Sequence, residues 1–317
     1  MNESKATLAA TLVFLGLSAT AHAETLTIEG LTSANQPGFS KIETIAIDRF
    51  DGSDGQPLAF ELEDQLSSAT LFDQPYFEVI GGRSAVEPDA TLSGNVTVDI
   101  DQYETTAKRN RCIARNDKDK CTERKDIVVD CLQRSINFRA RVRGVRFEDG
   151  RNIYSESFPR EEDETICFGD DKEFSKNDSV IRKMISDTAR EIRNDLAPRQ
   201  YRREIRVLES RKGMTKSEGK FFKAAVKMTK KDAAQACRMW DEMAVNGLSN
   251  ISLAFNRGLC AERSGDLSNA MVYYREAQTL SSKKYEVGQA LNRVNDHQRA
   301  LDEWDLRRSD GSTVKSN

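Results

Sequence analysis

The chain has 317 residues, of which 38% are hydrophobic and 31% are charged, with a formal net charge of -3. This composition is typical of globular proteins and, with a mean hydropathy of -0.63, excludes a polytopic membrane protein. The length corresponds to about two domains. The sequence contains only two histidines. Ser-His or Cys-His catalysis and multi-histidine metal sites are therefore not expected.

Residues 1–23 have the pattern of a cleavable secretory signal. Lys5 precedes a short apolar run over residues 8–17, and Ala21-His22-Ala23 has the small-residue spacing of a cleavage site. The run is shorter than the about 20 apolar residues that span a bilayer, and no cysteine follows it that could carry a lipid. We therefore predict an exported, periplasmic protein that is soluble, is not lipidated and keeps no transmembrane segment after cleavage.

Six cysteines follow the signal segment. An even number in an exported chain, with no C-x-x-C pair, predicts disulfide bonds rather than a zinc site, and no cofactor is expected. The four cysteines of the first half should pair among themselves in one of three connectivities: Cys112, Cys121, Cys131 and Cys167.

Charge is distributed unevenly along the chain. Residues 24–107 contain sixteen acidic and only three basic residues, whereas residues 195–231 contain twelve basic and four acidic residues. This asymmetry indicates either an anionic partner or docking of one half of the chain on the other, and a solvated surface is the alternative.

The first half is predicted to mix strands and helices. Strands are expected at 25–31, 42–47, 76–80, 91–100 and 127–147, followed by a turn at 148–150 and a strand at 151–158. Pro57 opens a helix in which leucines recur every four residues, and a second helix is expected over 179–196, before Pro198. The fold class is α+β, with a mixed and partly antiparallel sheet.

The second half is predicted to be all helical and to repeat. A shift of 34 residues superimposes residues 217–250 on 251–284, aligning Ala224 with Gly258, Asp232 with Asp266, Ala236 with Ala270 and Trp240 with Tyr274. A 34-residue period of paired helices is typical of a short solenoid. A helix over 285–306, apolar along one face, is predicted to cap it.

The segment 251–284 resembles a tetratricopeptide repeat, through Gly258, Gly265-Asp266, Ala270, Tyr274 and Ala277. In that family, neighbouring repeats touch where Cys237 and Cys260 would lie, so the resemblance implies a disulfide between these two residues. It also implies a protein-binding surface rather than an enzyme.

Residues 41–197 resemble the periplasmic domain of curli-secretion lipoproteins and of the lipoprotein activators of penicillin-binding proteins. The residues that carry this resemblance are Ile45-Ala-Ile-Asp48, Asp89-Ala-Thr-Leu-Ser-Gly94, Glu148-Asp-Gly150 and Leu196-Ala-Pro198. Members of that group are adaptors or secretion components.

The predicted organisation is a signal peptide at 1–23, an α/β domain at 24–197 and a basic connector at 198–216. A helical domain with its capping helix follows at 217–306, and a disordered tail at 307–317.

Two basic surfaces are candidate sites. A protein-binding face is expected at Lys220, Lys223, Lys227, Lys230 and Lys231, and an anion-binding face at Arg139, Arg141 and Arg143.

Each surface also has a plainer interpretation. The lysines could solvate a helix or rest on the acidic half of the chain, and the arginines could line a solvated sheet face or lie under the acidic segment 156–173.

We predict a non-enzymatic adaptor or scaffold that binds another protein during assembly or secretion in the bacterial cell envelope. The alternatives are a binder of an anionic envelope polymer or lipid and a carboxylate-dependent glycan hydrolase. Nucleic acid is not an expected partner.

Overall fold

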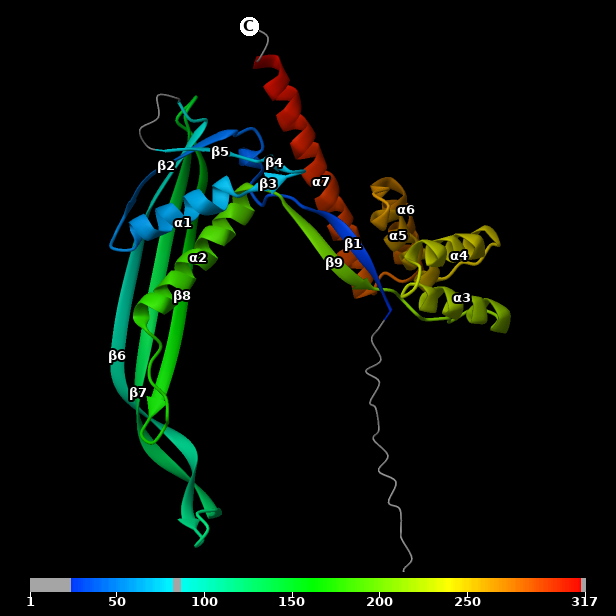
Figure 1. Cartoon of the computed structure of the whole chain (residues 1–317). Helices are drawn as coiled ribbons and strands as arrows, with labels where there is room; N and C mark the ends of the chain where they lie inside the picture. Colours follow the sequence, from blue (N-terminus) through cyan, green and yellow to red (C-terminus); the bar gives the residue numbers. More distant parts are fainter. Residues whose placement is uncertain (1–23, 82–86, 315–317) are drawn as a thin grey trace, which may run out of the picture. The chain divides into compact units, whose positions relative to one another are not determined.

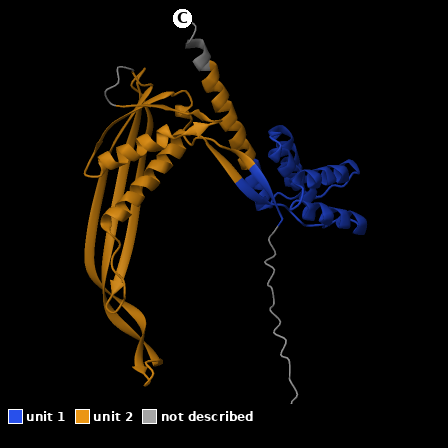
Figure 2. Cartoon of the chain, in the orientation of Figure 1, with its two compact units in different colours: residues 1–28, 203–291 blue, residues 29–202, 292–317 orange. Residues whose placement is uncertain are grey.

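The computed structural model describes residues 24–81 and 87–314, and the chain divides into two compact units (Figures 1 and 2). Unit 1 holds the described residues up to Ile28 together with Arg203–Leu291, and unit 2 holds Glu29–Arg202 and the chain from Asn292 onward. The predicted signal segment, residues 1–23, lies outside the described residues.

Unit 2 is built on a five-stranded mixed sheet in the order β5-β2-β6-β7-β8. Its strands are β2 (Thr44–Asp51), β5 (Glu78–Ile80), β6 (Ala90–Arg115), β7 (Cys121–Arg146) and β8 (Asn152–Cys167). β2 pairs in parallel with β5 and β6, whereas β6, β7 and β8 form an antiparallel meander. The predicted mixed, partly antiparallel sheet is confirmed.

Two helices cover one face of this sheet, α1 (Gly55–Ser67) and α2 (Asn177–Leu196) (Figure 1). Both are amphipathic, with apolar residues at helical spacing, so each buries one stripe on the sheet. The buried stripe of α1 consists of Leu58, Leu62 and Leu66. In β7, alternate residues face these helices and are buried, and the residues between them face away. One face of β7 therefore remains open to solvent.

The antiparallel hairpin of β6 and β7 is longer than the sequence indicated, because strands were predicted only at 91–100 and 127–147. β8 pairs with β7 only as far as Cys131, opposite Cys167. From there β6 and β7 continue as a two-stranded ribbon to Arg115 and Cys121. The ribbon has no apolar face, since its residues are mostly exposed and mostly polar or charged, so its strands could not be recognised from hydrophobic alternation.

Shorter elements complete the strand content. A 3-10 turn lies at Pro37–Phe39, and β3 (Thr70–Leu71) pairs with β4 (Gln74–Pro75). β1 (Thr25–Thr32) pairs with β9 (Arg199–Arg206) as a separate two-stranded sheet. The predicted basic connector at 198–216 therefore contains a strand, which the sequence analysis missed because six of its eight residues are polar or charged.

Unit 1 contains two helix pairs. They are α3 (Lys216–Met228) with α4 (Ala233–Val245), and α5 (Ile251–Arg263) with α6 (Leu267–Leu280). Asp232 and Asp266, 34 residues apart, accept from the backbone N–H groups of Gln235 and Asn269 and so cap the second helix of each pair. The correspondence fails at Ala224, which is exposed, whereas Gly258 is buried.

Aromatic side chains fill the space between paired helices in unit 1. Phe222 contacts Trp240, with ring centroids 6.4 Å apart, and Phe255 contacts Tyr274 at 5.5 Å. Gly258 lies directly against the Tyr274 ring, because a Cβ at that position would come within 2.4 Å of it. The missing side chain lets α5 and α6 approach closely.

Helix α7 (Tyr285–Val314) differs from the prediction of a capping helix followed by a disordered tail. The helix continues through residue 314, and the division between the units falls inside it, after Leu291. Ala300 and Trp304 join the hydrophobic core of unit 2, and Arg307 is buried there as well. The two compact units therefore have other bounds than the predicted domains at 24–197 and 217–306. The described residues up to Ile28 belong to unit 1, and the second half of α7 belongs to unit 2.

Candidate functional site

The five candidate lysines lie on α3 and in the turn that follows it, and all five are exposed. We call them the α3 lysine row. Lys220, Lys223 and Lys227 follow one another at helical spacing of three and four residues, which places them on one side of α3. The opposite side of the helix is buried through Phe222, Ala225 and Val226, so packing holds the row toward solvent.

Carboxylate partners of the α3 lysine row are few. Lys230 Nζ lies 3.4 Å from Glu24 Oε2, both within unit 1. Lys220, Lys223, Lys227 and Lys231 form no ion pair with any residue in the described ranges. Lys230 therefore contacts one residue of the acidic first half, Glu24, within unit 1.

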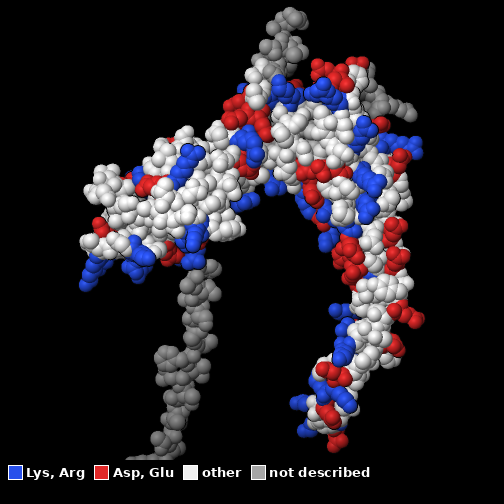
Figure 3. All heavy atoms as spheres, turned by 180° about the vertical axis from the view of Figure 1, so that it is seen from behind, with Lys and Arg blue, Asp and Glu red and all other residues white. Residues whose placement is uncertain are grey.

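Arg139, Arg141 and Arg143 all lie on the open face of β7, between the buried residues Phe138, Ala140 and Val142. Their side chains are exposed, and within the described part of unit 2 none of them is in an ion pair. Figure 3 shows the side of the molecule away from α1 and α2, where both basic and acidic side chains lie along the sheet. The predicted alternation of this strand is confirmed.

The acidic segment 156–173 does not cover these arginines. Most of it forms β8, which lies beside β7 and pairs with it in register from Gly144 to Cys131. Several of its carboxylates instead bind other cations: Glu164 lies 2.8 Å from buried Arg134, and Asp170 lies 2.6 Å from Arg111. The backbone N–H of Cys167 and the guanidinium of Arg111 lower the pKa of Asp170.

All six cysteines are paired, which confirms the prediction of disulfides. Cys112 is bonded to Cys121 near the end of the ribbon, and Cys131 to Cys167 between β7 and β8. Cys237 of α4 is bonded to Cys260 of α5, so this bridge connects the two helix pairs.

A hollow of about 760 Å³ in unit 2 is lined by residues of β4, β5 and α7. Arg307 lies there over the ring of Tyr76, at 4.2 Å from its centroid, and donates to the backbone carbonyl oxygens of Tyr76 and Ser40. Trp304 stacks on the same ring, 6.2 Å away. Burial lowers the pKa of Arg307 and raises the pKa of Tyr76. These contacts attach α7 to the core.

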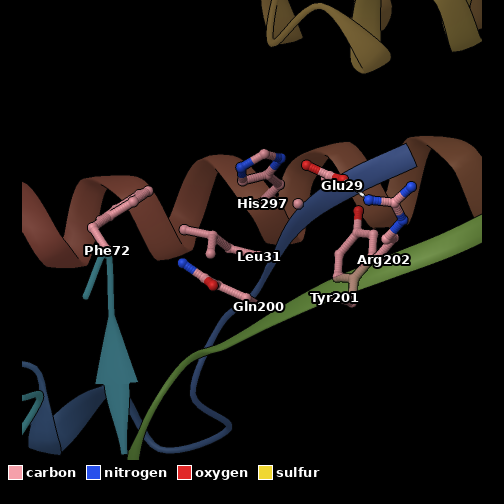
Figure 4. A pocket seen from close by; sticks show the side chains of 8 residues that line it. Glu29, Leu31, Phe72, Gln200, Tyr201, Arg202 and His297 are labelled. Atoms are coloured by element: carbon pink, nitrogen blue, oxygen red, sulfur yellow. Dashed lines mark hydrogen bonds and ion pairs between the residues drawn. The ribbon is translucent and has the colours of Figure 1, made fainter. Parts of the chain in front are cut away.

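A second hollow, of about 510 Å³, is lined by β1, β9 and α7 within unit 2 (Figure 4). An ion pair of 2.8 Å between Arg202 and Glu29 lies at one side. Gly30 is required here, because a Cβ would come within 2.5 Å of the Tyr201 hydroxyl and 3.0 Å of His297 Nδ1. His297 is half-buried and forms part of the wall.

In residues 24–81 and 87–314, no group of three or more His, Cys, Asp or Glu side chains is placed to hold a metal ion. Within the same ranges, no helix is long and apolar enough to cross a membrane.

The sequence analysis did not find the polar residues that flank the arginines. Register places Ser93 and Ser155 on either side of Arg143, and Asn95 and Ser157 on either side of Arg141. On the β8 side, the register shifts by one residue between Val145 and Gly144, so counting outward from the turn at 148–150 would have placed Tyr154, and not Ser155, opposite Arg143. On the β6 side, the turn at 116–120 lies at the far end of the hairpin, and register shifts between Cys112 and Arg115 separate it from the arginines.

Comparison with known proteins shows no matching family model and no curated protein with similar sequence. Among solved structures, a minor lipoprotein from Acinetobacter baumannii covers 49% of this chain and 90% of its own, at 11% identity and a TM-score of 0.22. A putative neuraminyllactose-binding hemagglutinin homolog from Helicobacter pylori covers 50% of this chain and 84% of its own, at 14% identity and a TM-score of 0.25. Similarity at this level assigns neither a family nor a function to the chain.

Proposed function

We propose that this protein is a non-enzymatic adaptor of the bacterial cell envelope, and that it binds an acidic segment of another protein through the α3 lysine row. In this proposal, the helix pairs of unit 1 act as tetratricopeptide-like repeats in an exported, periplasmic protein. The observation that carries it is that four exposed lysines on and after α3 have no carboxylate partner in the described residues. Exposed charges of one sign steer association with an oppositely charged partner and select it.

The three disulfides support the proposed location, because such bonds persist in oxidising compartments. The bridge from Cys237 to Cys260 connects α4 with α5, which would hold a surface made by both helix pairs in one arrangement. The caps at Thr215, Asp232, Asn250 and Asp266 define where the four helices begin, so α3 presents its lysines from a fixed first turn.

The test uses the charge-reversal variant Lys220→Glu, Lys223→Glu, Lys227→Glu. Lys230 is left unchanged because it contacts Glu24. A matched control reverses three exposed basic residues elsewhere in unit 1, Arg263→Glu, Arg275→Glu, Lys283→Glu. Both variants have the same net charge, so a difference between them reports the position of the charges.

The probe is a fluorescent peptide of alternating glutamate and alanine, titrated in low and high salt. Each exposed ion pair contributes about 0.5–1 kcal/mol, so three lost pairs should weaken binding by about 30-fold. The control should bind like the unaltered chain. Crosslinking in an envelope extract should then capture a partner with the unaltered chain and the control, and not with the α3 variant.

Two results would overturn the proposal. Capture that persists in the α3 variant and disappears when Arg139, Arg141 and Arg143 are replaced would assign protein binding to the sheet. Release of soluble fragments from purified cell-wall material would contradict a non-enzymatic role.

A further inference from the structure

The open face of the sheet in unit 2 carries three consecutive rows of side chains, each centred on an arginine of β7. Ser93, Arg143 and Ser155 form the first row across β6, β7 and β8. Asn95, Arg141 and Ser157 form the second, and Thr97, Arg139 and Pro159 form the third. We call these rows the arginine tract. Its arginines are flanked by short side chains, all of them uncharged and five of them polar.

The next two rows differ sharply in charge. Asn137 is flanked by Asp99 and Glu161, and Ser135 by Asp101 and Asp163. Cross-strand neighbours of opposite charge stabilise a sheet. Here the carboxylates do not lie beside the arginines, so the sheet does not gain this stabilisation. Instead the positive charges occupy one stretch of the face and the negative charges the next. The arginine tract is therefore a bounded positive surface, three rows long.

Several other arginines of unit 2 form ion pairs within the protein. Arg134 pairs with Glu164, Arg146 with Asp149, and Arg160 with Glu191. Arg139, Arg141 and Arg143 are exposed and form no ion pair with any residue between 24 and 81 or between 87 and 314. An anion that binds them would not have to displace a carboxylate of the same chain.

The tract is hollowed as well as charged. A hollow of about 450 Å³ is lined by Arg141 and Arg143 together with Ser93, Asn95, Ser155 and Ser157. Glu156 and the ion pair of Arg49 with Asp51 also line it, so its basic residues outnumber its carboxylates by three to two. A second one, of about 330 Å³, is lined by Arg139, Thr97 and Pro159 and, from the adjoining acidic row, by Asp99 and Glu161. Gly94 lies in the first, where a Cβ would come within 2.3 Å of the Arg141 carbonyl oxygen. Small side chains thus flank the arginines, and carboxylates of the neighbouring row and strands share the two hollows with them.

We infer that the arginine tract binds one chain of an acidic polysaccharide, with one sugar carboxylate on each arginine. Alternate residues of a strand are about 7 Å apart, so the three guanidinium groups form a line rather than a convergent cluster. A line fits a linear polyanion with regularly spaced charges. Each guanidinium can hold a carboxylate through two parallel hydrogen bonds.

The flanking groups favour a sugar over other anions. Serine and threonine hydroxyls and the Asn95 amide can donate to and accept from sugar hydroxyls on both sides of each carboxylate. The three rows contain no aromatic side chain on which a nucleic-acid base could stack. This site lies on unit 2 and does not depend on the proposed binding of a protein to α3.

The experiment measures the affinity of the full mature chain for oligogalacturonate, a carboxylate-bearing oligosaccharide, by calorimetry at low and high salt. The test variant is Arg139→Gln, Arg141→Gln, Arg143→Gln. The matched control removes three exposed basic residues on or beside α2, on the opposite side of unit 2: Lys176→Gln, Arg182→Gln, Lys183→Gln. We expect binding to weaken by at least about 30-fold in the test variant, about threefold for each exposed charge contact, and to be unchanged in the control.

Further measurements separate a sugar site from general attraction of anions. The variant Asn95→Ala, Ser157→Ala keeps every charge and should still weaken binding several-fold, and oligogalacturonate whose carboxylates have been reduced to alcohols should not bind. The proposal is overturned if oligogalacturonate does not bind, if the arginine variant binds it as well as the unaltered chain, or if phosphatidylglycerol vesicles bind in its place. The α3 variant should bind the oligosaccharide normally, so this result and the test of protein binding are independent.

Discussion

Replacement of Gly258 by alanine should destabilise unit 1, although alanine is the better helix former. Gly258 lies inside α5, where the exchange alone would stabilise the helix by about 1 kcal/mol. The new Cβ, however, would lie 2.4 to 2.9 Å from three atoms of the Tyr274 ring. That ring cannot easily move, because it is buried and its hydroxyl donates to Glu262 at 2.6 Å. Overpacking of this kind costs about 3 kcal/mol, which leaves a net loss of about 2 kcal/mol.

The loss should be measured by urea unfolding, followed through Trp240 fluorescence in a Trp304→Phe background, since the chain has only two tryptophans. Gly288→Ala is the matched control. Gly288 also lies in a helix of unit 1, but a Cβ added there would have no neighbouring atom within 4 Å, so alanine should stabilise by about 0.5–1 kcal/mol. In a Tyr274→Ala background, Gly258→Ala should become neutral or stabilising. The reasoning is wrong if Gly258→Ala and Gly288→Ala have the same effect in the unaltered background.

Three further outcomes are expected. Removing the bridge with Cys237→Ala, Cys260→Ala should lower the free energy of unfolding of unit 1 by about 3 kcal/mol, the value expected for a separation of 23 residues. Urea unfolding measures this loss, which is expected even where the Trp240 fluorescence of the folded state is unchanged. Trp304→Ala should cost unit 2 about 3 kcal/mol or more in far-ultraviolet circular dichroism melts, because Trp304 is buried against Tyr76. Burial raises the pKa of Glu303, because the folded protein disfavours its ionised form. The free energy of unfolding should therefore fall as pH rises from the ordinary glutamate pKa to the raised pKa of the folded state. Glu303→Gln should therefore raise the urea midpoint of unfolding at neutral pH and leave it unchanged at acidic pH. An increase in the midpoint that is the same at both pH values would contradict this.

Much of the secondary structure could be predicted because local patterns agreed with packing. The leucines of α1 recur every four residues, and all three are buried. The turn at 148–150 separates β7 from β8, and Asp232 and Asp266 begin helices 34 residues apart. In these segments the hydrophobic period, the cap and the tertiary environment lead to the same structure.

The remaining features depend on contacts that no local pattern encodes. The ribbon of β6 and β7 and strand β9 are held by backbone pairing, and their own residues are mostly polar or charged and have no apolar period. Arg307 was assigned to a disordered tail because arginine is rarely buried. In the structure, its stem and guanidinium pack on the Tyr76 and Phe77 rings. The arginines of the tract were identified from alternation, but their neighbours on β6 depend on a register set by the whole hairpin.

The division of α7 between the two units has a consequence for the order in which the chain folds. Most of unit 1 is one continuous segment, Arg203–Leu291, and its helix pairs contact each other locally, so it can fold soon after it is synthesised. The core of unit 2 instead requires Ala300 and Trp304, which follow the whole of that segment. Until they arrive, the rings of Tyr76 and Phe77 lack the cover that Trp304 and Arg307 give them. The nascent α/β layer is therefore only partly covered until a segment more than 200 residues later has been made, and apolar surface that stays exposed during synthesis favours aggregation.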